Sequence, residues 1–310
     1  MIHRFWGLLF IFVAATCAQA ETLRLALDWK PGAEFGGFYA AQELGYFQDG
    51  SLDVQILAGG SSKPNTQMIA AGEVEYALTS ADQVVIAHDR GMHDIVALFA
   101  TFQTNPQAIM THAARGFTSI KEILRSDGVL LWQSGLSFTL FLTKHFGPVK
   151  PTVAPYLGGI GDFEHDPMVS QQCYVTDESI LAKAAGLEIN TFLIADTGFD
   201  PYGTVLITSR QRLETAPREV KAMVTAVRKG WESYLDDPVA TNAIMAKLNP
   251  AISLQTLATS AALQSSFIRT DEETRVGAMT ASRWQTLVAQ LLDVGVISKS
   301  IEANQLFLSQ

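Results

Sequence analysis

The chain has 310 residues, of which 48% are hydrophobic and 17% charged, enough for a globular core of one or two domains. Its formal net charge of −9 argues against nucleic acid and anionic membranes as partners. The six histidines are scattered, and the sequence carries no phosphate loop, nucleophile elbow or zinc-binding motif. We therefore expect no metal, no cofactor and no enzyme of these classes.

Residues 1–20 have the pattern of a secretory signal peptide. Arg4 gives a positive start, residues 5–15 form an apolar run, and Ala18-Gln19-Ala20 is a small-residue cleavage site. The run is short for a membrane span. We expect the mature protein to begin at Glu21 and to reside in the periplasm. Lipidation at Cys17 is the alternative, which the flanking residues fit poorly.

Removal of the signal peptide changes two properties of the chain. The formal net charge becomes −10, because Arg4 is the only charged residue that is lost. Cys173 is then the only cysteine, so no disulfide within the chain is expected. A single cysteine is usually a small buried side chain, and we expect the same of Cys173.

Strands and helices alternate along the first third of the mature chain. Apolar alternation predicts strands over 23–27, 52–57, 76–78 and 95–102. Helical spacing predicts helices over 38–44, 65–71 and 81–90, and a glycine follows each of them. This order is typical of parallel βαβ units.

A second series of βαβ units starts near Ala108. It consists of helices over 119–124, 138–145 and 177–185 and strands over 129–132, 152–156, 172–175 and 191–194, with a flexible loop at 158–161. A strand returns at 204–208. The remainder reads as helices that begin near Pro217, Asp237-Pro238 and Ser253, and a last apolar face ends at Gly295.

Three segments carry a family resemblance. The first is LDWKP followed by FYAAQELGYF within 27–47, the second is YVTDE at 174–178, and the third is FDPYG at 199–203. They resemble the periplasmic solute-binding proteins for thiamine pyrimidine precursors, which are related to binding proteins for alkanesulfonates and taurine and to the fungal hydroxymethylpyrimidine synthases. Gly32 stands where Asn is usual, Phe35 where His is usual, and Ser179 where Pro is usual.

The resemblance implies an α/β fold of the type II periplasmic-binding class, with two α/β lobes joined by a two-crossing hinge. Lobe one would comprise 21–110 and 204–310, and lobe two 111–203. The chain would cross near Met110-Thr111 and near Tyr202-Gly203. In open α/β sheets, ligands bind at the carboxyl ends of strands. We therefore looked for site residues where strands end.

The candidate ligand-binding residues lie at these strand ends or in the resembling segments. Trp29 offers a flat stacking surface, although a core position is its alternative. Ser80 could hold a polar group at a helix start or simply cap the helix. Glu178 could bind an amine, or it could be a helix-start residue favoured by the dipole. The full set is Trp29, Phe35, Tyr39, Ser80, Gln103, Trp132, Ser134, Tyr174, Glu178 and Tyr202.

By resemblance, the chain is the monomeric substrate-binding subunit of an ABC importer, and its partners are a membrane permease and its ATPase. The implied ligand is a thiamine pyrimidine precursor of the hydroxymethylpyrimidine or formylaminopyrimidine type. Riboflavin, alkanesulfonates and taurine are alternatives, although a sulfonate calls for Arg or Lys at the strand ends and only Lys30 is close. A pyrimidine synthase and a periplasmic sensor domain are the rivals from other classes. The synthase reading conflicts with Phe35 at the position of the active-site His.

Overall fold

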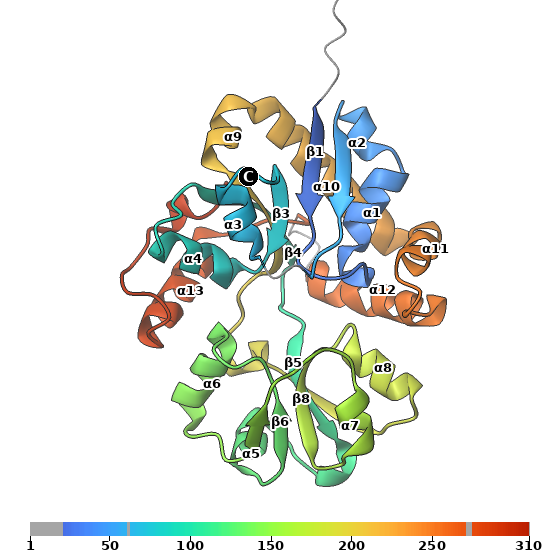
Figure 1. Ribbon diagram of the computed structural model, residues 1–310, viewed down its shortest axis with the longest axis vertical. Coiled ribbons are helices and arrows are strands. Elements are labelled where there is room, and N and C mark those ends of the chain that lie inside the picture. Colours follow the sequence, from blue (N-terminus) through green and yellow to red (C-terminus); the bar gives the residue numbers. More distant parts are fainter. Residues whose placement is uncertain (1–20, 61–62, 271–274, 310) are drawn as a thin grey trace, which may run out of the picture.

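Two five-stranded sheets, each covered by helices, form the two lobes of the protein, and the upper lobe in Figure 1 is the larger. The computed structural model describes residues 21–60, 63–270 and 275–309. The expected signal peptide and Cys17 lie outside the described residues. The expected architecture of two α/β lobes is confirmed by this arrangement.

Both sheets are built on the same plan. The first sheet has the order β2-β1-β3-β10-β4, and the second has the order β7-β6-β8-β5-β9. In each sheet, one strand runs antiparallel to its neighbours: β10 in the first and β5 in the second. Each is the strand that the chain enters on arriving from the other lobe. The first-sheet strands are β1 Thr22–Ala26, β2 Asp53–Leu57, β3 Tyr76–Thr79, β4 Ile95–Phe102 and β10 Gly203–Ser209. The second-sheet strands are β5 Gln107–His112, β6 Val129–Leu131, β7 Thr152–Ala154, β8 Val169–Tyr174 and β9 Ile189–Leu193.

The larger lobe carries nine of the named helices, and the last five follow the returning strand β10. They are α1 Gly36–Glu43, α2 Tyr46–Asp49, α3 Asn65–Ala70, α4 Ala81–Asp89, α9 Arg210–Thr215, α10 Pro217–Asp236, α11 Val239–Leu248, α12 Leu254–Ile268 and α13 Ala281–Asp293. The smaller lobe has α5 Ile120–Arg125, α6 Ser137–Phe146, α7 Gly161–His165 and α8 Glu178–Ala184. Helix α7 begins within the segment expected to be a loop.

Helices α1 and α10 approach each other closely because glycines face the contact. A Cβ on Gly37 would lie 2.2 Å from the ring of Trp231, and a Cβ on Gly230 would lie 2.1 Å from the carbonyl oxygen of Gly37. Trp231 itself is fully buried. This contact fixes the start of α1, and the turn that precedes it lines the cavity described below.

The two crossings between the lobes are bonded to each other. The first runs from β4 to β5 and the second from β9 to β10. The Asn105 amide donates to Asp200 Oδ1 at 2.8 Å, and Asn105 Nδ2 donates to the Pro201 carbonyl at 3.2 Å. The first crossing precedes β5, so it lies earlier than the expected position at Met110-Thr111, because residues 107–112 pair with β8 and β9.

Candidate functional site

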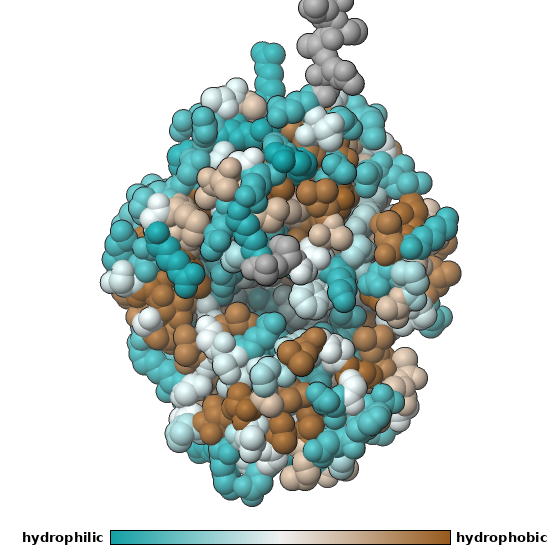
Figure 2. Space-filling view, in the orientation of Figure 1, coloured by the Kyte–Doolittle hydropathy of each residue, from teal (hydrophilic) through white to brown (hydrophobic). Residues whose placement is uncertain are grey.

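A cavity of about 490 Å³ lies between the lobes, where the carboxyl ends of strands from both sheets face each other. Figure 2 shows the molecule hollowed at this level. The lining comes from the ends of β1 and β3 in the larger lobe and of β6, β7 and β8 in the smaller lobe. Its volume is in the range of small-molecule sites.

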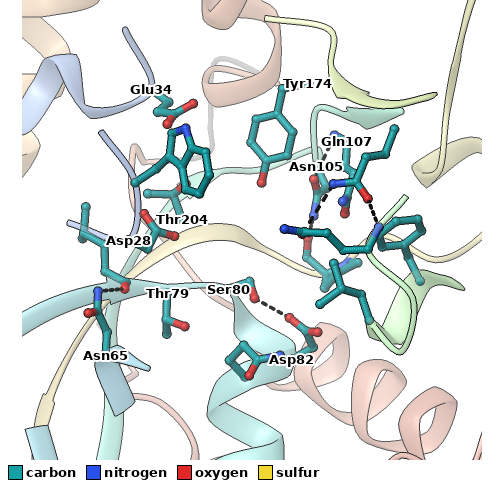
Figure 3. A pocket seen from close by; sticks show the side chains of 18 of the residues that line it. Asp28, Glu34, Asn65, Thr79, Ser80, Asp82, Asn105, Gln107, Tyr174 and Thr204 are labelled. Carbon is teal, nitrogen blue, oxygen red and sulfur yellow. Dashed lines mark hydrogen bonds between the residues drawn. The ribbon is translucent and has the colours of Figure 1, made fainter. Parts of the chain in front are cut away.

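One asparagine holds the larger lobe's strand ends in register. Asn65 Nδ2 donates to the carbonyls of Leu27 at 3.1 Å and Leu78 at 2.7 Å, so it joins the carboxyl ends of β1 and β3. The chain turns sharply after each strand, and Asp28 and Thr79 line the cavity there (Figure 3).

Five of the ten residues expected at the site line this cavity. Trp29 is 46% exposed although it is a large aromatic residue, so it is not part of the core. Phe35 is almost fully buried, Ser80 lies at the start of α4, and Tyr174 ends β8. Glu178 lines the cavity from the first turn of α8. Their contact with a ligand stays a prediction.

Glu178 also has a role within the protein. Its carboxylate accepts hydrogen bonds from the hydroxyl of Tyr156 and from the backbone amide of Tyr174, the latter at 2.7 Å. It therefore fixes the side chain of Tyr156 and the backbone of Tyr174 beside the cavity. Tyr156 is the last residue of the predicted strand over 152–156. Because ligands bind at the carboxyl ends of strands, Tyr156 was identifiable from the sequence as a candidate.

The other five expected residues do not line the cavity, for local reasons. Tyr39 is buried among the apolar side chains of the larger lobe. Gln103 is buried, and its Nε2 donates to the carbonyls of Ala100 at 3.2 Å and Ala278 at 3.1 Å. Trp132 packs against Phe138, with ring centroids 6.1 Å apart.

The two remaining residues each lie next to a residue that does line the cavity. Ser134 is exposed in the turn after β6, and Gln133 beside it lines the cavity. Tyr202 is buried under the guanidinium of Arg283, 4.1 Å from the ring centroid, and neighbouring Pro201 lines the cavity. In both segments, the residue next to the expected one lines the cavity in its place.

Carboxylates dominate the charged part of the lining. Asp28, Glu34, Asp82, Asp177 and Glu178 all line the cavity. Among the lining residues that the structure describes, Lys63 is the only cationic side chain, and it forms an ion pair with Glu73. Glu34 lies between the two motifs of the first resembling segment, and Asp82 lies two residues after Ser80, whereas Asp28 and Asp177 belong to the resembling motifs themselves.

Enclosure in the cleft shifts the titration of three of these carboxylates. Burial raises the pKa of Asp28 to about 6. Burial, and then the charge of Glu178, raise the pKa of Asp177 to about 7. Burial raises the pKa of Glu34 well above its ordinary value, and the charges of Asp177, Asp28 and Glu178 raise it further. The closed cleft therefore favours protons or a cationic group at this place.

Cys173 also lines the cavity, although its side chain is only 3% exposed. Burial raises the pKa of its thiol well above the ordinary value, and the charges of Glu178 and Asp177 add to this effect. The thiolate is therefore disfavoured, and the residue has the buried character expected of it.

Hydrogen bonds join the lobes across the cleft. Ser137 at the start of α6 donates to Asp82 Oδ2 at 2.5 Å, and Ser80 donates to the other oxygen of Asp82 at 2.5 Å. Figure 3 shows the Ser80–Asp82 bond at the start of α4. Ser260 of α12 donates to the carbonyl of Thr176 in the smaller lobe. The lobes are thus closed upon each other.

Within residues 21–60, 63–270 and 275–309, no group of three or more His, Cys, Asp or Glu side chains has the geometry to hold a metal ion. In the same part of the chain, no helix combines the length and the apolar character that a membrane span requires.

The two lobes with a cavity between them have the periplasmic binding protein fold. The periplasmic aliphatic sulphonate binding protein SsuA of Escherichia coli superposes with a TM-score of 0.71, at 12% identity over 94% of both chains. A ligand-binding component of an ABC-type import system from Staphylococcus aureus, solved with zinc bound, gives a TM-score of 0.69 at 12% identity over 94% of this chain and 97% of the other.

The sequence places the chain more narrowly. Residues 33–141 and 168–241 match the model of the NMT1/THI5 like family, and the chain belongs to this family. It is 24% identical over 236 residues to the formylaminopyrimidine-binding protein of Halalkalibacterium halodurans, covering 70% of this chain and 68% of that protein. It is 25% identical over 240 residues to 4-amino-5-hydroxymethyl-2-methylpyrimidine phosphate synthase THI11 of Saccharomyces cerevisiae, covering 71% and 69%. The family thus includes both binding proteins and synthases.

Proposed function

We propose that this chain is the periplasmic substrate-binding subunit of an ABC importer and captures a thiamine pyrimidine precursor of the hydroxymethylpyrimidine or formylaminopyrimidine type. One observation carries the proposal. The closed cavity between the lobes combines aromatic side chains, Trp29, Tyr156 and Tyr174, with carboxylates at the strand ends. A flat aminopyrimidine needs both, because its ring stacks on an aromatic face and its exocyclic amine donates to a carboxylate.

Lobe closure is the mechanism that we propose for capture. An open cleft admits the solute, and closure adds the bond between Ser137 and Asp82 and removes the ligand from bulk water. The closed form is the one that a membrane permease would recognise. Export is part of the same proposal, and N-terminal sequencing of the periplasmic protein should read Glu21-Thr22-Leu23.

The negative charge of the cavity lining disfavours an alkanesulfonate or taurine as the ligand. An alkanesulfonate or taurine presents an anionic group, which is best bound by Arg, Lys or backbone amides. The lining instead has five carboxylates, and its one cationic side chain among the described residues, Lys63, is paired with Glu73. Lys30, the cation close to the strand ends in sequence, does not line the main cavity.

The synthase alternative is disfavoured by the residues at the site. Phe35, a nearly buried residue of the cavity lining, stands at the position where the resembling synthases have their active-site His. No described histidine lines the cavity. A sensor domain would bind the same ligand, so transport itself is tested by ligand uptake into vesicles that contain the permease and its ATPase.

Calorimetric titration of the purified protein tests the ligand class. The panel comprises 4-amino-5-hydroxymethyl-2-methylpyrimidine, its formylaminomethyl analogue, riboflavin, taurine and an alkanesulfonate. We expect binding of the pyrimidines, and Trp29→Ala should weaken it at least about thirtyfold, or about 2 kcal/mol. Glu178→Gln should weaken it similarly, since it removes a charge-assisted bond worth about 1.5–3 kcal/mol.

The exposed Glu164 of α7 provides the matched control, and Glu164→Gln should bind like the wild type. Tight binding of taurine or an alkanesulfonate, without pyrimidine binding, would reject the proposed ligand class.

A further inference from the structure

The carboxylates of the cavity fall into two groups, according to whether the protein already supplies their hydrogen-bond donors. Asp82 accepts from Ser80 and Ser137, and Glu178 accepts from Tyr156 and Tyr174. The second group consists of Asp28, Glu34 and Asp177. Among the described residues, no other side chain donates a hydrogen bond or forms an ion pair with these three carboxylates, and Asp28 is held only by its own backbone.

These three carboxylates come from opposite lobes and interact with one another. Asp28 and Glu34 belong to the larger lobe and Asp177 to the smaller. Glu34 interacts electrostatically with both of the others. Lobe closure therefore gathers like charges in a partly desolvated place, which costs free energy unless protons or a positive group compensate.

A second, smaller cavity adjoins the first at this place. Its volume is about 60 Å³, and Trp29, Glu34 and Asp177 line both cavities. Thr176 also lines the small cavity, and its buried hydroxyl has no hydrogen-bond partner among the residues that the structure describes. A buried hydroxyl without a partner is costly, so this position favours a polar group that the protein itself does not supply.

The size and chemistry of the small cavity limit what can occupy it. About 60 Å³ accommodates a group of one or two heavy atoms. Two carboxylates and a hydroxyl accept hydrogen bonds, which suits an ammonium with its three donors. Lys30 lines the rim, but its exposed side chain forms no ion pair with Glu34 or Asp177. The carboxylates are not arranged to chelate a metal ion within the described residues.

We propose that the solute of this cavity is an aromatic amine in its cationic form, whose ring stacks on Trp29 and whose ammonium arm lies between Glu34 and Asp177 against the hydroxyl of Thr176. The proposal rests on the proposed function and narrows its ligand class: among thiamine pyrimidine precursors, one with a cationic aminomethyl arm should bind more tightly than one with a neutral hydroxymethyl or formylamino arm. A ring bearing a short cationic arm also benefits from the cation–π attraction of an indole.

Matched pairs of probes test the charge of the arm. The first pair is 4-amino-5-aminomethyl-2-methylpyrimidine and its 5-hydroxymethyl analogue, and the second is benzylamine and benzyl alcohol. At about pH 8, where Asp28 and Asp177 are ionised, the amine of each pair should bind about tenfold to a hundredfold more tightly than the alcohol. Calorimetric titration measures both members of each pair.

Three variants locate the effect. Glu34→Gln and Asp177→Asn should reduce the amine-to-alcohol ratio at least about tenfold while changing alcohol binding little. Thr176→Val removes an unpartnered hydroxyl at nearly constant shape, so it should weaken amine binding about threefold to tenfold without lowering the melting temperature. Glu43→Gln, at an exposed position of α1 in the same lobe, should leave both probes unchanged.

The outcomes separate this inference from the proposed function. Equal or tighter binding of the alcohols overturns the inference, and the pyrimidine function then stands. Binding of benzylamine without either pyrimidine overturns the pyrimidine function but keeps the aromatic amine class. Failure of all four probes to bind overturns the inference as well.

Discussion

Ser137→Ala should loosen the closed cleft without weakening either lobe. Ser137 is only 2% exposed and donates across the cleft to Asp82, which is itself buried. A hydrogen bond to a charged group contributes about 1.5–3 kcal/mol. Because this bond joins the two lobes, its loss falls on the closing equilibrium, and the ratio of closed to open molecules should fall about tenfold to a hundred-and-fiftyfold.

Stopped-flow dissociation of the bound pyrimidine, together with small-angle scattering, measures the effect of Ser137→Ala. Dissociation should accelerate by about the same factor, and the ligand-saturated protein should be more expanded than the wild type. Ser179→Ala is the matched control, because Ser179 is equally buried but donates to the Val175 carbonyl at 2.6 Å within its own lobe. It should lower the melting temperature and leave dissociation unchanged. If Ser137→Ala releases ligand at the wild-type rate, the bond to Asp82 does not hold the cleft closed.

Two further predictions concern stability. Gly37→Ala should lower the free energy of unfolding by about 1–3 kcal/mol in urea titrations, since its Cβ would lie 2.2 Å from the Trp231 ring, and unchanged stability would mean that α1 and α10 pack less closely than described. The unliganded protein should lose stability as pH rises from about 4 to 7. Burial, and then the charge of Glu178, raise the pKa of Asp177 from 3.8 to about 7, so the folded state keeps a proton that the unfolded state releases, worth up to about 1.4 kcal/mol per pH unit. Asp177→Asn should reduce this slope, and an identical slope in the variant would contradict the shift assigned to Asp177.

The sequence predicted those helices and strands whose bounds are set by the residues within them. The fourth strand was expected over 95–102, and β4 has these bounds because all eight of its residues are buried. Strand β5 was not assigned, since QAIMTH is short and partly polar and its position depends on pairing with β8 and β9, far along the chain. Sequence pattern does not specify such distant partners.

The site was predicted at the level of segments more than of side chains. Side chains of a strand alternate between the two faces of the sheet. If a site residue is chosen one position too early or too late at a strand end, the chosen side chain therefore points into the core and not into the cleft. Trp132 and Gln133 after β6 show this effect. Glu34 was missed for another reason, because the 3₁₀ turn Ala33–Phe35 that directs it to the cavity has no apolar period.

The antiparallel strand β10 has a consequence for how the molecule folds. Val205 of β10 pairs with Thr79 of β3 on one side and with Ala100 of β4 on the other. Strands β3 and β4 therefore cannot join into one sheet until β10, which follows the whole smaller lobe in the sequence, has been synthesised. The second sheet, in contrast, is formed entirely by residues 107–193. Closing a long loop loses conformational entropy before the stabilising contacts form, and this slows the pairing of β10. The smaller lobe should therefore gain hydrogen-exchange protection first, and the larger lobe should be the last part of the protein to become resistant to proteolysis.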